Sequence, residues 1–133
     1  MKSDTPILSI TGSDGFGETG IQSDIQTISE LGGHPLSIIT SVSVEKGDGS
    51  KRIFDLPVEI VTEQAQSIIE KAKPKAIKIG LIRDVQAIRR LRDEVIACKT
   101  IVCDPGIISS DGTPRFSGAK ATSSSTTLAT IWL

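Results

Sequence analysis

The sequence predicts an α/β fold in which a mostly parallel sheet is covered by helices on both faces. Short runs rich in apolar and β-branched residues alternate with longer segments whose apolar residues recur every three or four positions. The first pattern is typical of buried strands, and the second of amphipathic helices. Because the two patterns alternate along the chain, we expect three layers, with the sheet between two layers of helices.

Each element has its own local signal. Four strands are expected from short apolar runs, at residues 7–11, 36–44, 76–82 and 100–103. Three helices are expected between them, at residues 21–31, 58–72 and 85–95. Gly32 ends the first helix, Pro57 begins the second, and Asp84 caps the third. The first helix is predicted to turn one apolar face to the sheet, made of Ile21, Ile25, Ile28 and Leu31. The segment 45–52 is predicted to be a polar loop.

Composition excludes several classes of protein. The 133 residues carry 15 basic and 16 acidic side chains, and a formal net charge of −1 is not the footprint of a nucleic-acid-binding protein. Aromatic residues make up only 3% of the chain, so a stacking platform for bases is not expected. Cys98 and Cys103 are too few for a disulfide framework, and no metal-ligand spacing surrounds them, so reduced thiols are expected. Without a signal peptide or an apolar run of about 20 residues, the expected location is the cytoplasm, with no membrane partner.

The order of the elements also indicates where a ligand would bind. In parallel sheets of this kind, ligands bind beyond the carboxyl ends of the strands. The segments that follow the expected strands are therefore the candidate site, at residues 12–20, 45, 80–83 and 104–110.

The loop from Gly15 to Gly20 fits the pattern G-x-G-x-x-G between a strand and a helix. With Glu45 at the end of the second strand, it could bind a dinucleotide, or it could be a plain structural turn. Two details count against the dinucleotide. Gly12 and two more residues separate the strand from the motif, and Glu18 would place a carboxylate where phosphate should bind.

A longer set of residues gives a more specific interpretation. It consists of Ile10-Thr-Gly-Ser-Asp14, Gly17, Gly20-Ile-Gln-Ser-Asp24-Ile-Gln-Thr27, Leu31-Gly32, Ile38-Ile-Thr-Ser41, Lys78-Ile-Gly-Leu-Ile82 and Val102-Cys-Asp-Pro105. This set resembles the hydroxymethylpyrimidine and phosphomethylpyrimidine kinases of thiamine biosynthesis, which have the ribokinase-like fold. The resemblance covers residues 7 to about 116. Vitamin B6 kinases share the architecture, so a pyridoxal or pyridoxine kinase is the alternative.

The resemblance implies a kinase that moves the γ-phosphoryl group of ATP, with Mg²⁺, onto the hydroxymethyl group of a pyrimidine. The main chain at Gly12 would approach the pyrimidine, and Asp24 would accept hydrogen bonds from the ring or its amine. Asp104 would lie near the magnesium ion and the phosphates, since a carboxylate is a hard ligand for a hard cation. Each carboxylate also has a purely structural alternative. Asp24 could complement a helix N-terminus, and Asp104 could begin a turn.

Several positions depart from the family pattern and leave the substrate open. Glu45 and Leu81 are also expected to line the substrate pocket, where the family usually has glutamine and methionine. A carboxylate accepts hydrogen bonds but cannot donate them as a glutamine amide does. Glu18 and Thr19 replace Gly-Ala, and Gly106 replaces valine. A non-catalytic domain that binds a small heterocycle is therefore a second alternative.

The last part of the chain breaks the pattern. Residues 1–116 resemble the N-terminal part of the kinase domain, whereas residues 117–133 are rich in Ser and Thr and continue no periodicity. A frame shift or an internal stop is one hypothesis for their origin. The family's Gly-rich nucleotide motif and catalytic residue are not found, so no catalytic residue is assigned and the chain is expected to be inactive alone. A sheet that ends after its fourth strand would expose an apolar edge, and a homo-oligomer is expected.

Two further features are assigned structural roles. His34 lies between Gly33 and Pro35 with no obvious partner, and a place in a surface loop is expected. Four lysines straddle the end of the second helix and are interpreted as a solvated helix terminus, at positions Lys71, Lys73, Lys75 and Lys78.

Overall fold

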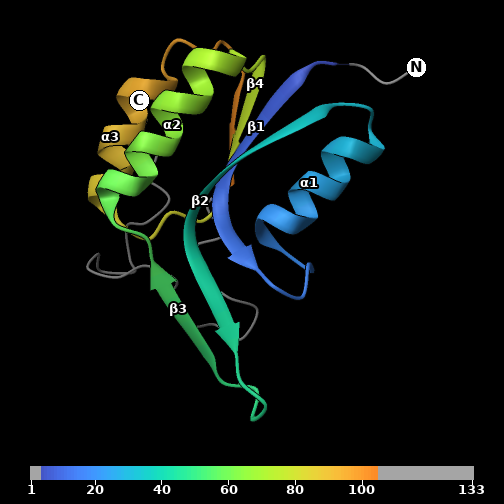
Figure 1. Cartoon of the computed structure of the whole chain (residues 1–133), viewed down its shortest axis with the longest axis vertical. Helices are drawn as coiled ribbons and strands as arrows, with labels where there is room; N and C mark the ends of the chain where they lie inside the picture. The colour runs from blue at the N-terminus through green and yellow to red at the C-terminus, as the bar shows by residue number, and fades with distance from the viewer. Residues whose placement is uncertain (1–3, 105–133) are drawn as a thin grey trace.

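In the computed structural model, residues 4–104 form one mixed sheet flanked by helices (Figure 1). The strands are β1 (Pro6–Asp14), β2 (His34–Glu45), β3 (Lys51–Asp55), β4 (Ala76–Ile79) and β5 (Ile101–Cys103). The helices are α1 (Gly20–Glu30), α2 (Val58–Ala72) and α3 (Val85–Val95). The structure describes residues 4–104. The expected boundary at residue 116, Gly106 and the Ser/Thr-rich segment 117–133 lie outside these residues.

The sheet has the strand order β3-β2-β1-β4-β5. β1 pairs in parallel with both β2 and β4, and β4 pairs in parallel with β5. β3 runs antiparallel to β2. The prediction of a mostly parallel sheet is therefore confirmed.

The prediction of a polar loop over residues 45–52 was wrong at its two ends, because β2 includes Glu45 and a fifth strand begins at Lys51. β2 continues to Glu45, and a tight turn brings the chain back as β3. In the turn, the Asp48 carboxylate accepts a hydrogen bond from the Ser50 amide at 2.9 Å, and Gly49 has a φ of 80°. Three of the five residues of β3 are charged, and the strand is too short to show a clear alternation of apolar and polar residues. The sequence therefore did not predict a strand there.

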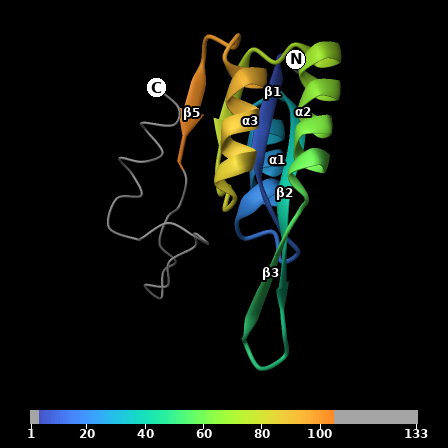
Figure 2. The same cartoon turned by 90° about the vertical axis from the view of Figure 1, so that its left-hand side faces the viewer.

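The predicted three layers are present. α1 covers one face of the sheet, while α2 and α3 cover the other, as the two perpendicular views show (Figures 1 and 2). The β2–β3 hairpin extends beyond the layered part of the molecule in both views. None of the helices in the described part of the chain is both long and apolar enough to cross a membrane.

The apolar core lies between the sheet and the α2–α3 layer. Alternate residues of the central strands point into it, so Leu8 and Ile10 of β1 and Ile77 and Ile79 of β4 are all buried. The remaining core residues come from β2, the loop after β4 and the two helices, and they are Ile38, Val61, Ala65, Ile82, Ala87, Ile88, Leu91 and Val95. Burial of these side chains is the main source of stability on this side of the sheet.

The face of the sheet under α1 has a different character. Between the core residues of β1 and β4 lie Ser9, Thr11 and Lys78, which point to the α1 side. α1 buries Ile21, but Leu31, expected on its apolar face, is 84% exposed. Leu31 is the residue that caps the helix C-terminus, so it lies past the last helical turn and outside the face that packs.

The predicted helix boundaries otherwise lie close to the observed ones. The Asp84 side chain accepts a hydrogen bond from the Gln86 amide at 2.7 Å, as expected of an N-cap. Lys73 ends α2 in the left-handed conformation, with a φ of 47°. His34 is exposed as expected, although it begins β2 instead of lying in a loop. Both cysteines are free.

Candidate functional site

The carboxyl ends of the parallel strands meet at one edge of the sheet, and an irregularity in the β1–β2 pairing marks its centre. Thr11 pairs with Ile39, but Ser13 pairs with Val42, so one more residue is used on β2 than on β1. Gly12 lies opposite this extra residue. Bulges of this kind redirect the backbone and are common beside functional sites.

Two glycines allow the first turn of α1 to lie directly on the end of β1. A Cβ atom on Gly20 would collide with the carbonyl oxygen of Gly12, and Gly20 has a φ of 69°. A Cβ atom on Gly12 would lie 2.6 Å from the Ser41 hydroxyl. The backbone of Gly12 is therefore enclosed by β2 on one side and by α1 on the other. Only residues without a Cβ permit these close approaches.

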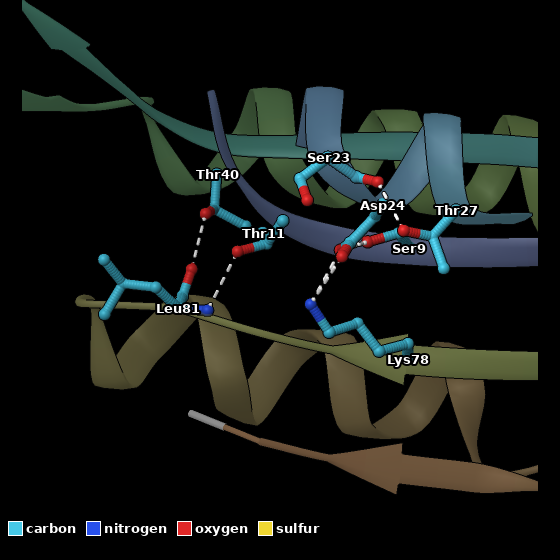
Figure 3. A network of polar contacts seen from close by, with 8 residues as sticks. All are labelled: Ser9, Thr11, Ser23, Asp24, Thr27, Thr40, Lys78 and Leu81. Carbon is cyan, nitrogen blue, oxygen red and sulfur yellow. Dashed lines mark hydrogen bonds and ion pairs between the residues drawn. The ribbon is translucent and has the colours of Figure 1, made fainter. Parts of the chain in front are cut away.

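The segment after β4 is fixed by two buried threonines. The Leu81 amide donates to the Thr11 hydroxyl at 3.0 Å, and the Thr40 hydroxyl donates to the Leu81 carbonyl at 2.9 Å (Figure 3). Gly80 makes the contact possible, because a Cβ there would lie 2.8 Å from the Thr11 Cβ. The structure thus places the Leu81 backbone beside Thr11, the residue before Gly12.

Asp24 points from α1 to the sheet, where a lysine and a serine bind it (Figure 3). The Lys78 ammonium donates to both carboxylate oxygens, at 2.9 and 2.7 Å, and the Ser9 hydroxyl donates to Oδ2 at 2.5 Å. The Asp24 and Lys78 side chains are 18% and 35% exposed. A carboxylate has about four lone-pair positions, so it retains the capacity for one further donor.

The role expected for Lys78 was wrong. It was interpreted as part of a solvated helix end, but it lies in the middle of β4 and pairs with Asp24. A charged residue between two isoleucines of a parallel strand was the available signal. Such strands are buried on both faces, so a lysine there requires an anionic partner.

Glu45 lies apart from these groups. It is the last residue of β2, four positions beyond Ser41, which corresponds to about 13 Å along a strand. Its carboxylate is 3.7 Å from the Lys51 ammonium across the hairpin, and both side chains are exposed. In this structure, Glu45 is therefore not brought together with Gly12, Asp24 and Leu81.

Asp104, the expected magnesium-side residue, follows β5 directly. Its amide donates to the Ile79 carbonyl at 2.8 Å, and the residue is exposed. Partial burial of the Cys103 thiol, together with the negative charge of Asp104, raises the pKa of that thiol above its ordinary value. Within residues 4–104, no three metal-ligating side chains gather into a cluster.

The glycine-rich loop is organised around Asp14, a residue that the sequence analysis did not single out. The Asp14 carboxylate accepts hydrogen bonds from the Phe16 amide at 3.1 Å and from the Thr19 amide at 3.0 Å and hydroxyl at 3.2 Å. The Asp14 carbonyl accepts a hydrogen bond from Gly17. The loop amides that a pyrophosphate would need are thus bound by the chain itself, around a negative charge. This arrangement argues against the dinucleotide alternative.

The hydrogen bonds also change the acidity of Asp14. Partial burial raises the pKa of the carboxyl group, but the hydrogen bonds from Phe16 and Thr19 together outweigh it. The pKa therefore lies below its ordinary value of 3.8.

A second ion pair lies beside the Leu81 segment. An Arg83 guanidinium nitrogen is 3.3 Å from the Asp55 carboxylate, and this contact joins the end of β3 to the loop after β4. Three carboxylates near the strand ends are thus paired with a cation. Asp24 pairs with Lys78, Asp55 with Arg83, and Glu45 with Lys51.

Comparison with known proteins gives one consistent result. The family profile described as phosphomethylpyrimidine kinase matches residues 14–131. The hydroxymethylpyrimidine/phosphomethylpyrimidine kinase of Rhizobium meliloti (strain 1021) is 34% identical over 106 residues, which are 79% of this chain and 40% of that kinase. The corresponding kinase of Streptomyces coelicolor is 30% identical over 107 residues, again 40% of its length. The chain thus spans about 40% of the length of these curated relatives.

Solved structures agree with the sequence matches. The crystal structure of phosphomethylpyrimidine kinase from Clostridium difficile 630 superimposes with a TM-score of 0.79 at 31% identity, and the match covers 86% of this chain and 51% of that one. Pyridoxal kinase from Staphylococcus aureus in complex with AMP-PCP superimposes with a TM-score of 0.74 at 25% identity, over 82% of this chain and 41% of that one. The resemblance and the ribokinase-like fold expected from the sequence are confirmed.

The contact between Gly20 and Gly12 can be tested by substitution. Gly20→Ala is expected to lower the free energy of unfolding by about 2 kcal/mol or more, because it adds left-handed strain and a collision with the Gly12 carbonyl. The matched control is Gly15→Ala in the same loop, where a Cβ meets nothing within 4 Å. Urea denaturation should find the control within about 0.5 kcal/mol of the wild type. Equal effects of the two substitutions would contradict the proposed close packing.

The acidity of Asp14 predicts a pH-dependent contribution to stability. Asp14→Asn is expected to lower the free energy of unfolding by about 1 kcal/mol at pH 7, because an amide accepts the loop hydrogen bonds less strongly than a carboxylate. The pKa of the folded protein is depressed, so the contribution is complete above about pH 5 and is lost as the pH falls through the folded-state pKa. Denaturation at several pH values should therefore show the two proteins converging in acid. A difference that stays constant or widens at low pH would contradict the role of the ionised carboxylate.

Proposed function

The chain belongs to the phosphomethylpyrimidine kinase family, and from this premise we propose that it binds a hydroxymethyl-substituted pyrimidine at the carboxyl ends of β1, β2 and β4. The observation that carries the proposal is the polar face under α1. There Asp24 is bound by Ser9 and Lys78 and retains hydrogen-bonding capacity, and it lies one helical turn after Gly20, which contacts the Gly12 carbonyl. The ligand would lie where open α/β sheets bind their ligands.

Each residue has a defined part in the proposed complex. The main chain at Gly12 borders the ring, since no side chain separates it from the site. The remaining acceptor position of Asp24 takes a hydrogen bond from a ring nitrogen or the exocyclic amine. Leu81 covers an apolar edge of the ring, and its backbone is already fixed by Thr11 and Thr40. Little reorganisation is therefore needed on binding.

The local charges favour an uncharged ligand. Asp24, Asp55 and Glu45 are each paired with a cation, so these three carboxylates carry little net charge, while the ionised Asp14 carboxylate near them disfavours an anionic ligand. A neutral heterocycle with donors and acceptors is complementary to such a surface. Glu45 reaches the ring only if the β2–β3 hairpin bends over the site, and we propose it as a secondary contact.

Phosphoryl transfer is the second part of the proposal. ATP would supply the γ-phosphoryl group, and Asp104 would contribute one carboxylate on the magnesium side. Transfer of this kind depends on positioning the nucleotide and on neutralising charge around it. The chain spans about 40% of the length of the curated kinases it matches. We therefore propose that the 133-residue chain binds the pyrimidine but does not transfer phosphate alone.

Pyridoxal is the second candidate ligand. The structural similarity to the Staphylococcus aureus pyridoxal kinase, with a TM-score of 0.74, is nearly as high as that to the phosphomethylpyrimidine kinase. The substitutions at Glu45 and Leu81 change groups that would face either ring. We favour the pyrimidine because the sequence identity is higher for that family.

Self-association also remains a proposal. The sequence analysis expected an apolar edge after the fourth parallel strand, which is β5. Its residues Ile101 and Val102 are 38% and 59% exposed. Their exposure is consistent with an interface at β5.

Isothermal titration calorimetry on the 133-residue chain tests the binding proposal. Hydroxymethylpyrimidine is expected to bind, ATP is expected to give no binding heat, and pyridoxal is expected to bind more weakly. Asp24→Ala should weaken pyrimidine binding by about tenfold or more, because a hydrogen bond to a charged group is lost. Arg90→Ala is the control, since Arg90 lies on α3 and forms only an exposed contact with Glu59 at 4.0 Å.

Three outcomes would contradict the proposal. They are the absence of heat with the pyrimidine, tighter binding of pyridoxal than of the pyrimidine, and equal affinities for the Asp24 and Arg90 variants. Because Asp24→Ala leaves the Lys78 ammonium without its anion, circular dichroism must first show that the variant is folded. If it is not, Asp24→Asn replaces it in the same comparison.

A further inference from the structure

The ammonium group of Lys78 has more donors than the described residues use. Its Nζ atom donates to both Asp24 oxygens, at 2.9 and 2.7 Å, and these are the hydrogen bonds of that group within residues 4–104. An ammonium group carries three N–H donors, so one N–H remains. The Lys78 side chain is 35% exposed, and the remaining donor is therefore within reach of a molecule that comes from solvent.

The lone pairs of Asp24 can be assigned atom by atom. Oδ2 accepts hydrogen bonds from the Ser9 hydroxyl and from Lys78, which fill its two positions. In the part of the chain that the structure describes, Oδ1 accepts from Lys78 alone, so its second position is open. Ser9 is fully buried, and its hydroxyl serves only Asp24. The open acceptor of Asp24 is thus on Oδ1, 2.9 Å from the Lys78 Nζ atom.

The Lys78 side chain directs its ammonium group to the carboxyl end of β4. It extends towards Leu81 in the close view (Figure 3). Gly80 follows β4 directly, and a Cβ atom there would lie 3.5 Å from Nζ and fill the space beside it. Because Gly80 has no side chain, this space stays open. The unused donor therefore lies at the strand end where the ligand is proposed to bind.

We propose that Oδ1 of Asp24 and Nζ of Lys78 together recognise an amidine edge, in which a ring nitrogen lies next to a carbon that bears an amine. The amine donates a hydrogen bond to Oδ1, and the ring nitrogen accepts one from Nζ. The ligand thus presents a donor and an acceptor side by side to an acceptor and a donor that are 2.9 Å apart. This inference rests on the proposed function, and it makes the ligand an aminopyrimidine.

The pair also discriminates between the two candidate ligands. Hydroxymethylpyrimidine carries an amine next to a ring nitrogen. In pyridoxal, the carbons beside the ring nitrogen bear a methyl group and a hydrogen atom, so no donor lies next to the acceptor. A site built to hydrogen-bond a group rejects an analogue that lacks it, because a polar group of the site is left unpaired. Glu45 could not recognise this edge, since a carboxylate cannot donate to the ring nitrogen.

Isothermal titration calorimetry with two analogues tests the inference on the 133-residue chain. One analogue is hydroxymethylpyrimidine with a methyl group in place of the amine. The other is ortho-aminobenzyl alcohol, which keeps the amine and the hydroxymethyl group but has no ring nitrogen. The wild type should bind each analogue about tenfold or more weakly than hydroxymethylpyrimidine, because each lacks one hydrogen bond to a charged group.

Lys78→Met should remove the preference for hydroxymethylpyrimidine over the aminobenzyl alcohol, to within about threefold, because the ring nitrogen has lost its donor. A purely structural role of Lys78 would weaken both ligands alike and leave the preference unchanged. Lys75→Met is the matched control and should keep the preference. Lys75 is exposed, and its amide donates to the Pro6 carbonyl at the opposite end of the sheet.

A second variant keeps the test decisive if Lys78→Met does not fold, which circular dichroism will show. Asp24→Leu combined with Lys78→Met removes both charges, so neither is left unpaired, and it should lose the preference over both analogues. The absence of binding heat with hydroxymethylpyrimidine in the wild type would contradict the proposed function and this inference with it. Binding of hydroxymethylpyrimidine no tighter than that of an analogue would overturn this inference alone. A preference that persists in the folded Lys78 variants, or is lost in Lys75→Met, would do the same.

Discussion

The ion pair between Asp24 and Lys78 determines how the first helix meets the sheet. A lysine in the middle of a parallel strand is unfavourable, because removing an ammonium group from water costs several kcal/mol unless an anion compensates it. α1 supplies that anion, and the Ser9 hydroxyl completes its hydrogen bonding. The pair is only partly buried, so its net stabilisation is small, but either charge without the other would be strongly unfavourable. This requirement helps to fix the rotation and the height of α1 over β1 and β2.

The two faces of the sheet consequently have different roles. The face under α2 and α3 carries the apolar core, and it provides most of the stability. The face under α1 carries Ser9, Thr11 and Lys78, and it provides hydrogen-bonding groups at the strand ends. Because α1 is held by the ion pair, its first turn can lie against Gly12 through Gly20 without a large apolar contact of its own. Polar groups can thus be presented at the strand ends at little cost to the core.

The sequence was sufficient to predict the elements whose apolar residues recur regularly. It was insufficient where strand pairing or a contact between distant residues decides the structure. The three helices and the four parallel strands follow from apolar spacing alone, and Asp84 was recognised as a cap. β3 was not predicted because its charged residues Lys51 and Arg52 are typical of a loop. It is a strand because it pairs with β2. Gly12, Asp24 and Leu81 were predicted as site residues through the family resemblance. The partners that hold Asp24 and Leu81 come from distant parts of the chain, and they are Lys78, Thr11 and Thr40. Only Lys78, between two isoleucines of β4, gave a local sign of such a contact.

We propose that the polar face under α1 is the ligand site. The most direct test is a titration of the isotope-labelled chain with hydroxymethylpyrimidine, followed through the backbone amide resonances. The account predicts that the largest shifts occur at Gly12, Asp24 and Leu81, with little change in α2 and α3. Shifts confined to the β2–β3 hairpin or to the α2–α3 layer would contradict it.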